Sequence, residues 1–162
     1  EKAIKTKTKN INDAIGNIRE KIIQCNNLTG ENDVIFERLK ECRSLKDALG
    51  QLEINDIESY VNDFLQEFPT ATQSSAVKEA NSLKNRHLDV CNQALKVEGN
   101  LLAYLIKYHT EKLSAFQREV ANYNDKLVWC EPEHDNDRNS LETKFSSLVD
   151  IDKGLTDCSR RQ

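Results

Sequence analysis

Cysteine and histidine are the residues of this 162-residue chain with the most specific chemistry. The segment Cys130-Glu131-Pro132-Glu133-His134 has a loosely metal-like spacing and also contains two carboxylates. A structural zinc site needs about four ligands, and no second Cys or His pair follows this segment. Solvated carboxylates in an acidic turn are the simpler interpretation of Glu131 and Glu133. The sequence therefore predicts no metal site, and nothing in it suggests a cofactor.

The other two histidines, His87 and His109, lie on apolar seams, where a packed or partly exposed imidazole is more common than a ligand or base. The sequence contains no glycine-rich phosphate loop, no nucleophile elbow and no His-Glu-x-x-His motif. Without a nucleophile and base in a recognisable pattern, we expect that the chain is not an enzyme.

The cysteines are odd in number and follow the apolar pattern of the chain. Four lie on apolar seams and Cys91 adjoins one; the full set is Cys25, Cys42, Cys91, Cys130 and Cys158. Buried free thiols behave as small hydrophobic side chains. The pattern therefore predicts a reducing compartment, either cytosol or nucleus.

Trp129 is the single tryptophan, and it lies off the apolar stripe near the end of a predicted helix. Two interpretations stay open. The ring packs beneath the loop that follows, or it forms part of a partner-binding hot spot, where tryptophan is enriched. Trp129 is our candidate partner-binding residue.

Charge and composition exclude two classes of partner. The net charge is −4 and the basic residues are scattered, which argues against nucleic-acid binding. No apolar run reaches the length of about 18 residues that a membrane span needs, so we expect no direct membrane contact in this segment. With 31% charged residues, five Gly and two Pro, the composition favours long amphipathic helices, an all-α fold.

Apolar residues recur at gaps of three and four along most of the chain, the spacing of heptad helices. This spacing predicts helices over 2–26, 33–68, 75–104, 105–131 and 137–162, the third running without a break into the fourth. A slip in the heptad between Leu52 and Ile57, next to Gly50, predicts a local bend. Pro69 ends the second helix, and Ser74 or Ser75 is expected to cap the next.

Two parts of the pattern match each other at an offset of about 105 residues, and the match continues across a loop. The paired positions are Ile11–Phe116, Ile15–Val120, Ile18–Tyr123, Ile22–Leu127, Cys25–Cys130, Ile35–Leu141, Leu39–Phe145, Cys42–Leu148, Leu45–Ile151, Leu49–Leu155 and Leu52–Cys158. We predict one complete three-helix unit over 1–104, and the first two helices of a second over 105–162. The last pair of helices then lacks its third helix and leaves an apolar groove.

These features resemble the spectrin-repeat family. The segment Leu83-Lys84-Asn85-Arg86-His87-Leu88-Asp89-Val90 is similar to its leucine, asparagine, arginine, tryptophan pattern, with His87 in place of the tryptophan. Ile22 and Leu127 lie where its other hallmark tryptophan is expected. Because it lacks both tryptophans, the chain more closely resembles the divergent repeats of giant cytoskeletal linkers. Among these it is most similar to nesprins, with plakins or dystrophin as alternatives.

The resemblance implies an antiparallel three-helix bundle whose third helix continues into the next repeat, giving an elongated rod. It also implies a spacer that transmits force and docks cytoskeletal proteins, in the nesprin-like case linking the nucleus to actin and docking a formin or another actin-associated protein. Such a parent would lie on the cytoplasmic face, at the outer nuclear membrane. We expect a monomeric fragment. The alternative is a coiled-coil scaffold segment that homodimerises through the incomplete repeat.

Overall fold

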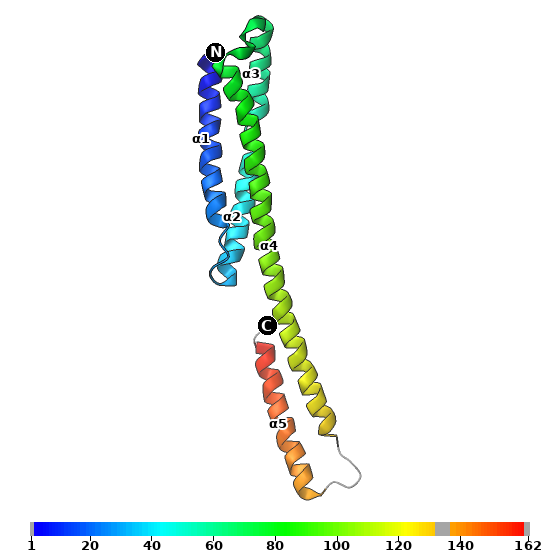
Figure 1. The fold of residues 1–162 in the computed structure, drawn as a ribbon. Helices are drawn as coiled ribbons and strands as arrows, with labels where there is room; N and C mark the ends of the chain where they lie inside the picture. Colours follow the sequence, from blue (N-terminus) through cyan, green and yellow to red (C-terminus); the bar gives the residue numbers. More distant parts are fainter. Residues whose placement is uncertain (1, 132–136, 161–162) are drawn as a thin grey trace. The chain divides into compact units, whose positions relative to one another are not determined.

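A computed structural model describes residues 2–131 and 137–160, and every element in these ranges is a helix. The α-helices are α1 (Lys2–Cys25), α2 (Asn32–Gly50), α3 (Ile54–Glu67), α4 (Ser75–Trp129) and α5 (Arg138–Arg160), with a short 3-10 helix, η1 (Pro69–Gln73), before α4 (Figure 1). The chain is therefore all-α, as its composition and periodicity predict.

The structure divides into two units, Glu1–Lys107 and Tyr108–Gln162. We call them unit 1 and unit 2. Helix α4 has 55 residues and contributes to both. The sequence prediction placed a boundary after residue 104, whereas the structural division falls after Lys107. That each unit corresponds to one repeat stays a prediction.

In unit 1, α1, the α2–α3 pair and the first part of α4 lie side by side, and α2 and α3 run opposite to α1 and α4 (Figure 1). Each of these helices carries one apolar stripe, and the stripes meet in a common core because water is excluded from all of them at once. Its fully enclosed members include Ile15, Ile22, Ile35, Leu49, Ala94 and Leu101.

The single helix predicted over 33–68 is wrong, because the structure has two helices with a break at residues 51–53. The break explains the slip in the heptad. In an unbroken helix, the positions four and seven residues beyond Leu49 would turn Glu53 and Asp56 toward the core. The break resets the phase, and Ile54, Ile57 and Val61 are buried in their place.

Helix ends follow local chemistry. The Ser74 hydroxyl accepts a hydrogen bond from the backbone N–H of Val77 at 3.4 Å, the capping role expected for this serine. Helix α2 begins at Asn32, and the acidic Asp33 lies in its first turn. Gly30, in the connection before α2, has φ of 115°, a backbone conformation that favours glycine.

Unit 2 is a hairpin of the end of α4 and α5. Its buried residues in the described ranges are Cys130, Lys144, Ile151 and Cys158. The two helices approach closely where the Tyr123 ring crosses Gly154, which has no side chain to obstruct it. The Asp137 carboxylate accepts the Ser140 N–H at 2.7 Å and caps the start of α5.

Candidate interaction surfaces

The cysteines form no disulfide with one another in the described residues, and all except Cys91 are buried. Burial raises the pKa of Cys25 to about 11, assisted by the nearby charge of Glu41. Burial is also the main cause that raises the pKa values of the Cys42 and Cys91 thiols. A raised pKa keeps a thiol protonated at neutral pH, and the protonated form is neither nucleophile nor metal ligand. These cysteines therefore act as packing residues.

His87 has a structural role at the break between α2 and α3. Its Nε2 lies 2.9 Å from the Leu49 carbonyl oxygen, near the end of α2, and Cys91 Sγ lies 3.7 Å from the same nitrogen. The imidazole thus donates to a carbonyl that the interrupted helix leaves short of its usual partner. His109 is exposed on α4, with its ring edge-on to Tyr108 at 5.5 Å.

No group of three or more metal-ligating side chains occurs among residues 2–131 and 137–160. Cys130 is buried at the end of α4, whereas Glu133 and His134 of the segment considered above lie outside the described residues. Of its two acidic residues, Glu131 is exposed, as expected for a solvated carboxylate.

One ion pair network joins α4 to α2 in unit 1. Glu98 Oε1 lies 2.7 Å from Arg43 Nε, and Glu98 Oε2 lies 2.5 Å from Lys46 Nζ. The hydrogen bond from Lys46, and then the one from Arg43, hold the pKa of Glu98 below its ordinary value. Sequence periodicity could not find this network, because it depends on which helix flanks face each other.

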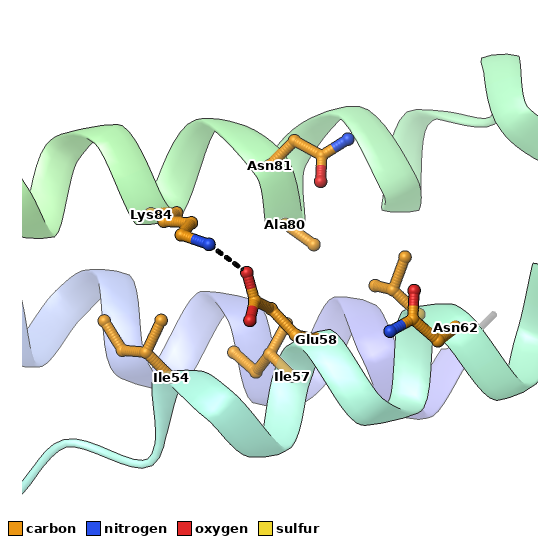
Figure 2. Close-up of a pocket in the computed structure, with 8 residues that line it drawn as sticks. Ile54, Ile57, Glu58, Asn62, Ala80, Asn81 and Lys84 are labelled. Atoms are coloured by element: carbon orange, nitrogen blue, oxygen red, sulfur yellow. Dashed lines mark hydrogen bonds and ion pairs between the residues drawn. The ribbon is translucent and has the colours of Figure 1, made fainter.

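A shallow groove of about 200 Å³ lies between α3 and α4 in unit 1. Figure 2 shows Ile57 and Ala80 facing this groove and the pair of Lys84 with Glu58 joining the two helices beside it. The alanine leaves the space open, and an exposed ion pair of this kind contributes only about 0–1 kcal/mol. The groove contains no nucleophile beside a base.

Trp129 is the last residue of α4 and its side chain is 54% exposed. The Lys144 ammonium lies 5.9 Å from the centre of its ring and donates a hydrogen bond to the Glu131 carbonyl at 2.8 Å. The ring also lines a groove with Tyr123 and Ile151. Residues 132–136 lie outside the described ranges, so both interpretations of Trp129 stay predictions. The buried Lys144 was not anticipated from the sequence.

The heptad positions of unit 2 are largely exposed. We call the exposed residues at these positions the unit 2 apolar face. It consists of Leu113, Val120 and Leu127 on α4 and of Leu141, Phe145, Leu148 and Leu155 on α5. Next to it, Leu113, Phe116 and Cys158 line a groove of about 600 Å³. Large apolar side chains exposed on both helices of this hairpin make it a candidate interaction site.

No helix in the described part of the chain is both long enough and apolar enough to cross a membrane.

Comparison with known proteins shows similarity to a much longer protein. The chain is 33% identical over 163 residues to the muscle-specific protein 300 kDa of Drosophila melanogaster. The match covers 99% of this chain and 1% of that protein, so the chain spans about one hundredth of the length of this relative. No family model matches the chain, and neither does any solved structure.

Proposed function

We propose that this chain is a non-catalytic segment of a large cytoskeletal linker, built from spectrin-type three-helix repeats. The observation that carries the proposal is the match to a much longer muscle protein along 99% of the chain. An all-helical structure with one apolar stripe per helix supports it, because such helices stack into arrays that act as spacers. In this proposal α4 is the shared helix that joins neighbouring repeats and transmits force between them.

The finer parts of the proposal follow the resemblance to nesprin-like linkers. In that setting the segment acts on the cytoplasmic side, linking the nucleus to actin through its parent chain. Half-exposed Trp129 is the proposed docking residue for an actin regulator such as a formin. Two features fit this role: the ring lines a groove, and its neighbour Lys144 is held in place by a backbone carbonyl.

Small-angle X-ray scattering of the chain tests the spacer role. We expect the profile of an elongated particle, because a shared helix of 55 residues would be about 80 Å long at 1.5 Å per residue. A compact, globular profile would contradict the proposal.

Docking is tested separately with purified actin filaments and a purified formin. We expect Trp129→Ala to weaken binding at least tenfold, as for a hot-spot tryptophan worth more than about 1.4 kcal/mol. The matched control is Val128→Ala, which removes a neighbouring exposed side chain. Equal binding by both variants would remove Trp129 as the anchor.

A second candidate function is a scaffold segment that homodimerises. The exposed unit 2 apolar face favours it. Analytical ultracentrifugation over a wide concentration range distinguishes the two functions, since a strictly monomeric chain excludes dimerisation as the main role.

A further inference from the structure

Helix α4 carries a second apolar stripe in unit 1, separate from the stripe that enters the core. Its large side chains are between 39% and 58% exposed: Leu88, Leu95, Leu102 and Ile106. Asn92 and Gly99 occupy the remaining positions, so the steps along the stripe are alternately four and three residues. This alternation is the spacing of a coiled-coil seam. We call these six residues the α4 outer seam.

The core of unit 1 does not account for the outer seam. Core residues of the same part of α4, such as Val90, Ala94 and Val97, are buried, whereas Asn92 and Gly99 of the seam are exposed. A Cβ atom added at Gly99 would have no neighbouring atom within 4 Å, so the middle of the seam is open. Single exposed apolar side chains are ordinary on protein surfaces, but four in heptad register on one helix face form a potential interface.

The residue types of the seam specify how it pairs. In coiled-coil terms its three leucines take the d positions, and Asn92, Gly99 and Ile106 take the a positions. A buried asparagine amide needs a hydrogen bond partner. In a parallel pair in register, Asn92 meets Asn92 of a second copy, and one amide donates to the other. In an antiparallel pair of these seams, a positions face d positions, so Asn92 would meet a leucine and lose its partner.

Charges beside the seam favour the same arrangement. Lys84 and Asp89 are exposed, lie on its two flanks, and are five residues apart. In a parallel coiled coil, side chains with this separation meet across the interface, so Lys84 of each copy faces Asp89 of the other. Lys84 also pairs with Glu58 of α3, and its ammonium has three donors for the two carboxylates.

We propose that the α4 outer seam binds the same seam of a second copy of this chain, in parallel and in register. This interface lies entirely in unit 1 and does not use the unit 2 apolar face. It goes beyond the proposed spacer function, because it joins two linkers side by side with the same polarity.

Sedimentation equilibrium of the whole chain, from about 1 μM to 1 mM, measures the association. Gly99→Leu should tighten it at least about tenfold, because it fills the open central layer of both copies with apolar side chains. The matched control is Gly16→Leu, at an exposed glycine of α1 with the same free space around it. It should leave the association unchanged.

Two glutamate variants locate the interface. Leu95→Glu should weaken association at least about tenfold, since it places two like charges in one layer of the seam. Phe145→Glu, on the unit 2 apolar face, should leave it unchanged. Circular dichroism verifies that each variant is as helical as the parent chain.

Cross-linking tests the parallel register. In the proposed pair, residue 99 of one copy meets residue 99 of the other, so Gly99→Cys should form a disulfide-linked dimer when oxidised with diamide. Gly16→Cys and the parent chain should cross-link more slowly. Asp89→Lys should weaken association about two- to fivefold, and adding Lys84→Glu should restore it.

Four results would overturn the inference. They are a monomeric chain at the highest concentration even with Gly99→Leu, association that survives Leu95→Glu, association that Phe145→Glu abolishes, or Gly99→Cys cross-linking no faster than Gly16→Cys. A monomeric chain with an elongated scattering profile would leave the proposed spacer function intact.

Discussion

Glycine and small residues decide how closely the helices of this protein approach each other. The clearest case is Gly154 of α5, where a Cβ atom would lie 2.6 Å from Cζ and 2.9 Å from Cε1 of the Tyr123 ring on α4. These distances are below normal van der Waals contact, so a side chain at this position must displace the ring. By contrast, a Cβ atom added at Gly16 of α1 would have no neighbouring atom within 4 Å.

We therefore expect Gly154→Ala to destabilise unit 2. Overpacking costs about 1–3 kcal/mol, and the better helix propensity of alanine offsets about 1 kcal/mol of it. Urea unfolding followed by the fluorescence of Trp129, which lies in unit 2, measures the loss. The control Gly16→Ala, followed by circular dichroism, should gain up to about 1 kcal/mol. A Gly154→Ala chain more stable than the parent would show that Tyr123 does not cross this glycine.

At the scale of elements, the break between α2 and α3 corrects the phase of the apolar pattern. Gly50 and the five-residue step from Leu52 to Ile57 are visible in the sequence, and they predict a bend. A bend keeps the helix continuous, whereas the structure ends one helix at Gly50 and begins another at Ile54. His87 then donates a hydrogen bond to the Leu49 carbonyl at 2.9 Å, which ties the break to α4.

The break gives opposite predictions for two adjacent positions. Ile54→Ala should cost about 2–4 kcal/mol, because it empties a buried site, while exposed Glu53→Ala should stay within about 0.5 kcal/mol. The free energy of unfolding from urea titrations followed by circular dichroism gives both values. If Glu53→Ala lowered the free energy of unfolding more than Ile54→Ala did, α2 and α3 would form one continuous helix, and the break described here would be wrong.

At the scale of the whole molecule, α4 supplies core residues to unit 1 and one of the two helices of the hairpin that forms unit 2. Its buried positions run from Ala76 to Leu105, all of them in unit 1. After Leu105 the apolar residues of α4 are at least partly exposed. Unit 1 thus has a closed core, whereas much of the heptad pattern of unit 2 remains in contact with water.

Tyr104→Pro tests whether this helix couples the two units. Proline removes a backbone hydrogen bond and clashes with the preceding turn, at a cost of roughly 3 kcal/mol or more. We expect the Trp129 fluorescence transition, which reports on unit 2, to separate from the circular dichroism transition and to move to lower temperature. Tyr104→Ala, which removes the side chain but keeps the helix, is the control. A single shared transition in Tyr104→Pro would contradict coupling through α4.

The sequence by itself determined the all-α class, the limits of most helices and the residues of the unit 1 core. It could do so because helix formation and stripe burial depend on spacing within one segment, as Ile15, Ile22 and Leu101 illustrate. Tertiary structure decided what depends on which flanks meet: the pairing of Glu98 with Arg43 and Lys46, the burial of Lys144, and the passage of Tyr123 over Gly154. It also distinguished the covered face of unit 1 from the open face of unit 2. Equivalent apolar patterns occur in both, and periodicity alone does not say whether another helix lies against them.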